Sequence, residues 1–164
     1  MKQLWAPWRM SYLRGEDEKV PGCLFCHKVT QEDAVEHILY RGTSCFVVLN
    51  RFPYTNGHMM IVPYMHTGML EALDEATLLE MMQLVQHSLR LLRQVFHPQG
   101  FNLGVNEGSV AGAGVAEHVH LHIVPRWAGD ANYMTVIGET RVIPQSLEDT
   151  YATFRPLFEA LHGG

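Results

Sequence analysis

The chain of 164 residues lacks a long apolar run. No stretch reaches the roughly 18 to 20 uninterrupted apolar residues that a membrane-spanning helix requires. Residues 1–12 carry Lys2 and Arg9 but lack the continuous apolar region of a secretory signal. These two absences predict a cytoplasmic protein without a membrane partner.

Positive charge is also scarce, since 12 Lys and Arg residues oppose 17 Asp and Glu residues and the formal net charge is −5. A protein that coats nucleic acid needs a basic face to displace counterions. The composition therefore argues against nucleic acid as the partner, although it is compatible with one bound nucleotide.

Cysteine occurs only three times. Cys23 and Cys26 form a C-x-x-C pair, whereas Cys45 lies alone in an apolar run. This usage suits a reducing compartment and a metal site better than a disulfide framework. The pair follows a Pro-Gly turn outside any strand-to-helix unit, so a thioredoxin-type redox pair is the weaker interpretation, and a pair of metal-free thiols is a further alternative.

The apolar fraction of 47% is sufficient for one globular domain. Short apolar runs between turn residues predict strands, and apolar residues at helical spacing predict two helices. The expected strands are 38–40, 45–49, 59–62, 101–106 and 118–125, and the expected helices are 73–96 and 146–161. Pro156 should kink or break the second helix. The pattern predicts an α+β fold with a five-stranded antiparallel sheet of meander character, a long helix packed across it and a C-terminal helix.

The ten histidines are the unusual part of the composition. His118, His120 and His122 alternate with Val119 and Leu121, so a continuous strand would project all three imidazoles from one face. A lone histidine on a sheet is usually a satisfied or solvated residue, but three in strict alternation favour chemistry. They suit either three ligands of a catalytic zinc or a central nucleophile with orienting neighbours.

The loop before these histidines, residues 108–116, is rich in glycine and alanine. Small residues let backbone amides approach an anion, as in phosphate-binding nests, although a plain flexible turn is the alternative. A phosphate-binding loop next to a histidine strand favours phosphoryl or nucleotidyl transfer.

The run His118-Val119-His120-Leu121-His122-Ile123-Val124 matches the histidine triad signature and resembles the nucleotide-binding histidine triad (HIT) superfamily. Residues 49–53, 56–63 and 124–127 extend the resemblance over most of the chain, and residues 5–10, 109–114 and 129–134 resemble the diadenosine tetraphosphate (Ap4A) phosphorylase branch. The resemblance implies one HIT domain spanning 1–164, with an N-terminal extension at 1–20 and a C-terminal extension at 129–164. It also implies a homodimer with a continuous sheet.

The resemblance implies that His120 attacks the α-phosphorus of an adenine nucleotide and forms a covalent nucleotidyl-histidine intermediate. His118, His122 and His58 would position it. The implied substrate-binding residues are Asn50 at the ribose, Asn106, and the loop residues Gly112, Ala113, Gly114 and Val115, with apolar residues near Phe46 and Val48 at the base. Arg126 and Arg141 could contact distal phosphates or lie in solvent, and neither is predicted to be a site residue.

Many hydrolytic members of the family carry a glutamine or serine shortly before the triad, whereas this chain has Gly114-Val115-Ala116-Glu117. The departure favours inorganic phosphate as acceptor, so that Ap4A plus phosphate yields ATP plus ADP. The alternatives are a hydrolase that releases AMP from dinucleoside polyphosphates or adenylated amines, and a purine-nucleotide-binding module with little turnover.

Several members that resemble this chain bind a structural zinc, and the resemblance assigns its ligands to Cys23, Cys26, His66 and His118. His27 is a rival ligand. No organic cofactor is expected. Trp5 and Trp8 are expected either to anchor the N-terminal segment or to reach a neighbouring site.

Overall fold

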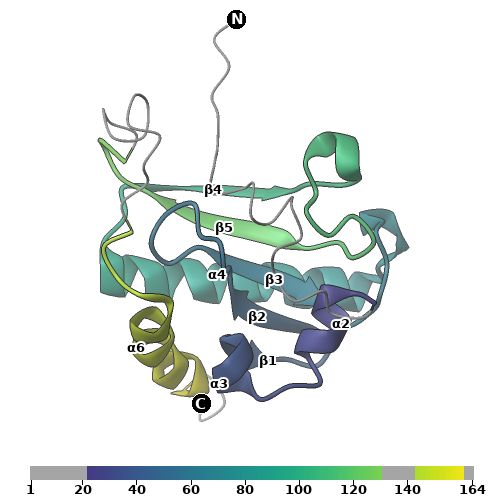
Figure 1. The fold of residues 1–164 in the computed structure, drawn as a ribbon, viewed down its shortest axis with the longest axis horizontal. Coiled ribbons are helices and arrows are strands. Elements are labelled where there is room, and N and C mark those ends of the chain that lie inside the picture. Colours follow the sequence, from purple (N-terminus) through teal and green to yellow (C-terminus); the bar gives the residue numbers. More distant parts are fainter. Residues whose placement is uncertain (1–21, 131–142, 161–164) are drawn as a thin grey trace, which may run out of the picture.

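The computed structural model describes residues 22–130 and 143–160. Its core is one antiparallel sheet of five strands in the order β1-β2-β3-β5-β4, so the predicted α+β fold is confirmed (Figure 1). The strands are β1 (Ile38–Arg41), β2 (Cys45–Leu49), β3 (Met59–Pro63), β4 (Gly100–Val105) and β5 (Leu121–Arg126).

The sheet is a meander only through its first three strands. β5 pairs with both β3 and β4, which leaves β4 at the edge. The reason is that α4 (Glu75–Phe96) carries the chain along one face of the sheet before the β4–β5 hairpin adds to β3. The motifs at 5–10 and 131–134, including Trp5 and Trp8, and Arg141 lie outside the described residues.

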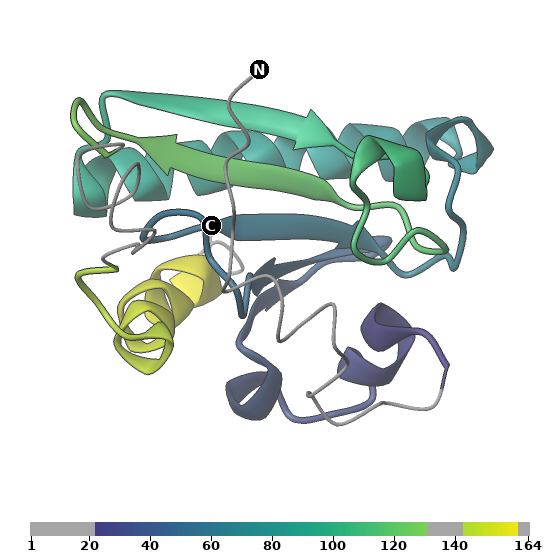
Figure 2. The same cartoon turned by 45° about the horizontal axis from the view of Figure 1, so that its top comes forward.

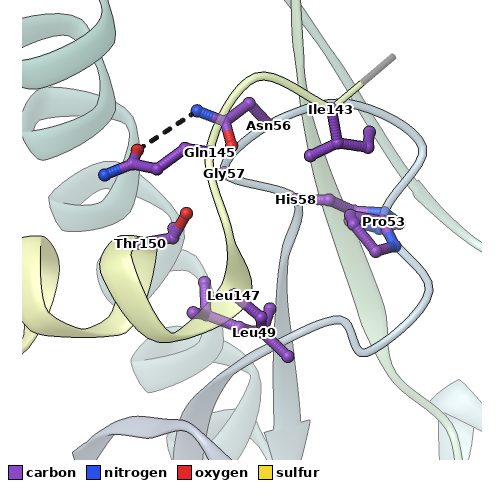
Figure 3. A pocket seen from close by; sticks show the side chains of 9 residues that line it. All are labelled: Leu49, Pro53, Asn56, Gly57, His58, Ile143, Gln145, Leu147 and Thr150. Atoms are coloured by element: carbon purple, nitrogen blue, oxygen red, sulfur yellow. Dashed lines mark hydrogen bonds between the residues drawn. The ribbon is translucent and has the colours of Figure 1, made fainter. Parts of the chain in front are cut away.

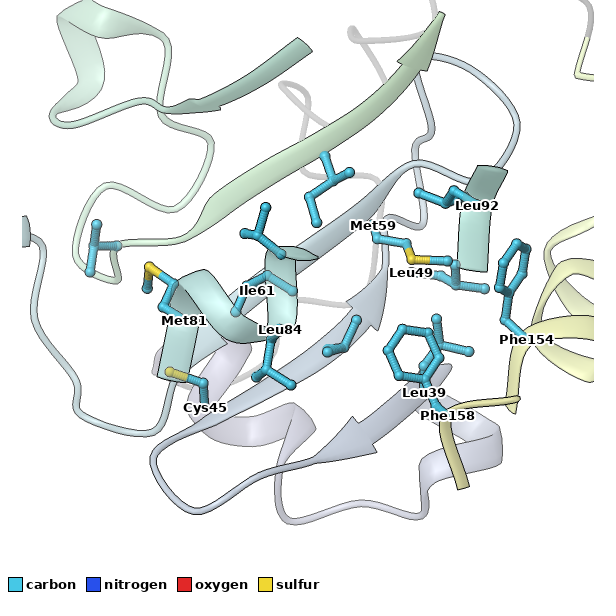
Figure 4. Packing of buried hydrophobic residues seen from close by; sticks show 14 of the residues in the cluster. Leu39, Cys45, Leu49, Met59, Ile61, Met81, Leu84, Leu92, Phe154 and Phe158 are labelled. Carbon is cyan, nitrogen blue, oxygen red and sulfur yellow. The ribbon is translucent and has the colours of Figure 1, made fainter. Parts of the chain in front are cut away.

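Helix α4 begins two residues later than the sequence pattern predicts because Asp74 caps it. The Asp74 carboxylate accepts a hydrogen bond of 2.7 Å from the Thr77 amide. The helix then lies along one face of the sheet (Figure 2), and its apolar stripe packs on that face (Figure 4). This cluster, the α4-side core, includes Leu39, Val47, Leu49, Ile61, Met81, Leu84, Val85 and Leu92.

The central strands are apolar on both faces. Along β2, Val47 contributes to the α4-side core, whereas Phe46 and Val48 face the opposite side and pack with Phe25 of α2 (Leu24–Lys28). Alternate residues of a strand point to opposite faces, so a strand buried on both sides is apolar throughout. Phe46 and Val48 are each 0% exposed in this second cluster.

Helix α6 (Leu147–Glu159) runs through Pro156, so the predicted break does not occur. A proline removes one backbone donor, here the partner of the Ala152 carbonyl, and Ala152 lies on the exposed side of the helix, where water can replace that donor. Phe154 and Phe158 are 0% exposed in the α4-side core. Their burial holds the helix on the domain.

The remaining elements are short. α3 (Asp33–Glu36) precedes β1, η1 (Leu70–Ala72) precedes α4, and η2 (Ser109–Ala111) lies in the loop between β4 and β5. Within residues 22–130 and 143–160, no helix combines the length and apolar character needed to cross a membrane.

Candidate active site and metal-binding cluster

The histidine run is not one continuous strand, which corrects the sequence prediction. β5 begins at Leu121, so of the three histidines only His122 lies on it. The pairing with β3 ends at Ile61 opposite Leu121. Two residues further along β3 stands Pro63, which has no amide to continue the ladder, and the Val119 amide instead donates to the Thr67 carbonyl at 2.7 Å.

His118 is anchored through Nε2, which donates to the Pro63 carbonyl at 2.8 Å. Because a carbonyl oxygen can only accept, this bond places the ring proton on Nε2 and leaves Nδ1 unprotonated. The side chain is 1% exposed, and burial lowers the pKa of His118 below its ordinary value. The ring is therefore neutral near pH 7, with Nδ1 available to a metal.

Three other donor atoms converge on that Nδ1. Cys23 Sγ lies 3.2 Å and Cys26 Sγ 3.7 Å from His118 Nδ1, and His66 Nδ1 lies 3.4 Å from both Cys26 Sγ and His118 Nδ1. All four donors lie within 4.8 Å of one another. Zinc bonds of about 2.3 Å to sulfur and 2.0–2.1 Å to nitrogen place donors of a tetrahedron roughly 3.3 to 3.8 Å apart. The donor set and its spacing fit a closed tetrahedral metal site.

The rival arrangements suggested by the sequence are not formed. In the part of the chain that the structure describes, His27 is not a member of a metal-binding cluster, and the three triad histidines do not share one. Instead, Nδ1 of His120 contacts the His118 carbonyl oxygen. Nδ1 of His122 contacts Nε2 of His58.

His120 is held by the backbone of the residue two positions before it. Its Nδ1 donates to the His118 carbonyl at 2.9 Å, which leaves Nε2 without a proton in the neutral ring. The side chain is 4% exposed, and burial lowers its pKa. An unprotonated imidazole nitrogen at neutral pH is the form that acts as a nucleophile.

Phe25 of α2 covers the two buried histidines. Its ring centroid lies 4.9 Å from that of His120 and 5.4 Å from that of His118. Phe25 is 2% exposed and stands between the two cysteines of the C-x-x-C pair. Sequence reasoning did not identify this residue, although an aromatic residue between two closely spaced cysteines is a signal that the segment packs on an apolar surface.

His122 belongs to a second hydrogen-bonded chain. The Tyr54 amide donates to Nδ1 of His58 at 3.1 Å, and Nε2 of His58 lies 3.0 Å from Nδ1 of His122. Since Nδ1 of His58 accepts, its proton lies on Nε2 and is donated to His122, whose own proton is then on Nε2. The tautomers of both rings follow from one backbone amide, which sequence patterns do not reveal.

Asn50 begins the loop of residues 50–58, which ends at His58. Its side-chain oxygen accepts from the Phe52 amide at 2.9 Å, and its backbone amide donates to the His58 carbonyl at 2.9 Å. Its side-chain nitrogen lies 3.4 Å from Nδ1 of His58. These three contacts fasten Asn50 to the loop that carries His58.

The glycine-rich loop is partly closed on itself. The amides of Gly112 and Ala113 donate to the carbonyls of Ser109 and Gly108 at 3.0 and 3.3 Å. These two amides therefore build the η2 turn, whereas the sequence pattern predicts that they face an anion. Val115 packs against the second apolar cluster, which contains Phe25, Phe46 and Val48. Its carbonyl accepts a hydrogen bond from the His118 amide at 3.3 Å. Asn106 directly follows β4.

Comparison with known proteins agrees with this geometry. A family model, the HIT domain, matches residues 31–129, which is more than half of the chain. The chain belongs to the HIT domain family. It is 41% identical over 157 residues to AP-4-A phosphorylase from Mycobacterium tuberculosis, covering 92% of this chain and 80% of that protein. The predicted membership of this family and the prediction of a HIT-family enzyme are confirmed.

Solved structures of the HIT family share the fold. A Zn-bound histidine triad family protein from Mycobacterium smegmatis is 28% identical with a TM-score of 0.69, covering 87% of this chain and 96% of that one. A hypothetical histidine triad nucleotide-binding protein from Sulfolobus tokodaii is 26% identical with a TM-score of 0.67, covering 85% and 93%.

Proposed function

We propose that this HIT enzyme is a nucleotidyltransferase that cleaves dinucleoside polyphosphates, converting Ap4A and inorganic phosphate into ATP and ADP. The observation that carries the chemistry is the orientation of His120, whose Nδ1 is occupied by the His118 carbonyl so that Nε2 is the reactive nitrogen. The substrate is suggested by the 41% identity to a protein named AP-4-A phosphorylase.

In the first step, Nε2 of His120 attacks the α-phosphorus of one adenosine and a nitrogen–phosphorus bond forms. The bond from that phosphorus to the bridging oxygen breaks, and ATP departs with the electron pair of that bond. The enzyme is left with an AMP group on His120. Splitting the transfer in this way divides one difficult step into two easier ones.

The leaving phosphate oxygen needs a nearby hydrogen-bond donor as negative charge develops on it. His122 is the proposed donor, because the chain from Tyr54 through His58 gives it a proton on Nε2. Its ring centroid lies 4.7 Å from that of His120. The two rings are therefore close enough to act on the same phosphoryl group.

In the second step, inorganic phosphate attacks the phosphorus of the AMP-histidine, the nitrogen–phosphorus bond breaks, and ADP is released. The stretch from Gly114 to Glu117 supports phosphate over water as the acceptor, since it lacks the glutamine or serine of many hydrolytic members. Val115 in this stretch packs into an apolar cluster, and Glu117 is exposed.

The substrate contacts are also part of this proposal. Asn50 would bind ribose hydroxyls, and Asn106, Gly114 and Val115 would line the phosphate path. Gly112 and Ala113 would contribute the shape of the loop, because their amides already donate to carbonyls within it.

We further propose that Cys23, Cys26, His66 and His118 bind one structural zinc, because four of the distances between their donor atoms, 3.2 to 3.7 Å, match those of a tetrahedral site. When bound, zinc supplies a rigid link between α2 and the catalytic segment and takes no part in bond cleavage. Within the chain, His118 would hold that link and orient His120 through its carbonyl.

A homodimer joined through β4 completes the proposal. β4 is an edge strand of the described sheet, and the consecutive residues Asn102, Leu103 and Gly104 are exposed. An exposed edge with an apolar residue, here Leu103 at 46% exposure, is a template for pairing with a second strand.

The deciding experiment is product analysis of Ap4A incubated with the purified protein, with and without inorganic phosphate, beside His120→Ala. Phosphate-dependent formation of ATP and ADP that is lost in the variant, with an AMP adduct on the wild-type enzyme by mass spectrometry, supports the proposal. ATP and AMP without phosphate would instead identify a hydrolase. Binding of adenine nucleotides without turnover would identify a nucleotide-binding module.

A further inference from the structure

Besides the hydrogen bond between His58 and His122, the loop that carries His58, residues 50–58, is fastened to its surroundings at three further points. The Thr55 hydroxyl donates to the Pro125 carbonyl of β5 at 2.8 Å. Gly57 presses on α4, where an added Cβ would lie 2.9 Å from both Leu92 and Phe96. The third point is a hydrogen bond of 3.4 Å from the Asn56 side-chain nitrogen to the side-chain oxygen of Gln145 (Figure 3).

The third point differs from the others because Gln145 lies beyond the matched HIT domain, which ends at residue 129. Gln145 stands just before α6 and is itself braced, since its side-chain nitrogen donates to the Thr153 hydroxyl at 3.4 Å. The Thr153 hydroxyl in turn donates to the Asp149 carbonyl at 2.7 Å. The C-terminal segment therefore offers the His58 loop a hydrogen-bond acceptor fixed to a helix.

A small cavity of about 40 Å³ lies between the loop and this segment, beside the hydrogen bond from Asn56 to Gln145. Pro53, Asn56, Gly57 and His58 line it from the loop, and Gln145 and Leu147 line it from the C-terminal side. Asn56 Oδ1 is buried, and among the described residues it is the one buried side-chain polar atom without a hydrogen-bond partner. A cavity of this volume accommodates a water molecule, which is the donor that a buried amide oxygen requires.

The position of this loop matters because the Tyr54 amide within it sets which ring nitrogen carries the proton in His58 and, through His58, in His122. The Tyr54 amide must point at Nδ1 of His58, 3.1 Å away, to keep the His58 proton on Nε2. His58 is 1% exposed, so solvent does not substitute readily for a misplaced amide. A loop released at Asn56, two residues from Tyr54 and two from His58, would weaken that bond.

We propose that Gln145 is a positioning residue for the His58–His122 pair. By accepting the hydrogen bond from Asn56, Gln145 holds the His58 loop in the position at which the Tyr54 amide reaches Nδ1 of His58. The effect on turnover rests on the proposed function, whereas the effect on loop geometry does not. The segment is thus a working part of the active site, although it touches none of the reacting atoms.

The test compares Gln145→Glu with Gln145→Leu in the full chain. Both variants lose the donor to Thr153, but only the glutamate keeps an oxygen acceptor for Asn56. Two signals report on the loop without substrate: hydrogen exchange of the Tyr54 amide and the ¹⁵N shifts of the His58 ring nitrogens. Turnover of Ap4A with phosphate is measured in parallel, as kcat and KM separately.

We expect Gln145→Leu to accelerate Tyr54 exchange by up to about tenfold and to lower kcat by a similar factor with KM little changed, since one hydrogen bond contributes that much. Gln145→Glu should remain within about twofold of wild type for both. Gln145→Ala, which adds no apolar volume, should match the leucine variant and serves in its place if that variant does not fold.

Unchanged Tyr54 exchange and His58 shifts in the leucine and alanine variants would overturn the proposal. Equal losses in the glutamate and leucine variants would also overturn it, because the acceptor would then be irrelevant. If wild type does not turn over Ap4A but Tyr54 exchange responds as expected, the positioning role stands and the proposed function fails.

Discussion

Nδ1 of His120 lies 2.9 Å from the carbonyl oxygen of His118, and the ring of the same His118 directs its Nδ1 at two cysteines and His66. One residue thus joins the candidate metal-binding cluster to the candidate nucleophile. A shift of the His118 backbone would move both, since the carbonyl that orients His120 and the side chain that faces the cysteines share one Cα.

Removal of the metal should therefore weaken both folding and catalysis. We expect the purified protein to carry about one zinc per chain. Cys26→Ser should lower zinc affinity by more than the roughly 10- to 100-fold that loss of an outer-shell partner costs. Metal content by mass spectrometry, thermal melting and the rate of Ap4A turnover measure these effects. Cys45→Ala is the matched control, because Cys45 lies in the α4-side core and outside the cluster. Equal zinc content in all three proteins would refute the assignment.

Phe25 should be important for stability. Truncation to alanine removes a buried ring that packs on His118 and His120, and such changes cost about 3–5 kcal/mol. Urea unfolding measures the loss. Val35→Ala, at a side chain that is 68% exposed, should change the free energy of unfolding by no more than about 0.5 kcal/mol. A similar small effect at Phe25 would mean that α2 does not pack on the triad in solution.

Gly57 should tolerate no side chain. Its φ of +75° is unfavourable for other residues, and an added Cβ would lie 2.9 Å from Leu92 and Phe96. Gly57→Ala should destabilise the protein by about 1–3 kcal/mol. Gly100→Ala is the control, because a Cβ there meets nothing within 4 Å. Chemical denaturation of the two variants should separate them, and equal stabilities would contradict the described position of the loop.

His37 should make stability depend on pH. Burial, partly opposed by the Glu148 carboxylate, lowers its pKa below 6.5. The folded state therefore binds the proton less readily than the unfolded state, so the stability contributed by neutral His37 is present above pH 6.5 and is lost as the pH falls through the lowered pKa. His37→Asn should flatten this part of the curve, since asparagine tolerates the φ of 56° at this position. Melting temperatures between pH 7.5 and 5 provide the comparison; parallel curves would contradict the prediction.

The proposed dimer should depend on Leu103. A lysine on an exposed edge strand disfavours pairing with another strand. Leu103→Lys should therefore shift the protein from dimer to monomer by light scattering. Val110→Lys, at a fully exposed side chain of η2, should leave the dimer intact. A wild-type protein that is monomeric at all concentrations would remove this part of the proposal.

Local patterns predicted much of the fold and named the residues of the candidate site. Alternation and apolar runs located four of the five strands to within about one residue, and helical spacing located α4 and α6. These signals are local because side-chain direction repeats every two residues in a strand and every 3.6 in a helix. The spacing of His118, His120 and His122 likewise indicates reactive histidines from the sequence alone.

Tertiary structure decided the features that depend on distant residues. Cys23 meets His118 across 95 residues of sequence, and the choice of His66 over His27 depends on how α2 packs against the end of β3. The strand predicted from His118 breaks because Pro63, on another strand, offers no amide to continue the ladder. The tautomers of His58 and His122 depend on the Tyr54 amide. A sequence pattern specifies which side chains are present and which way they point locally, but a proton's position depends on the partner that folding brings to each ring.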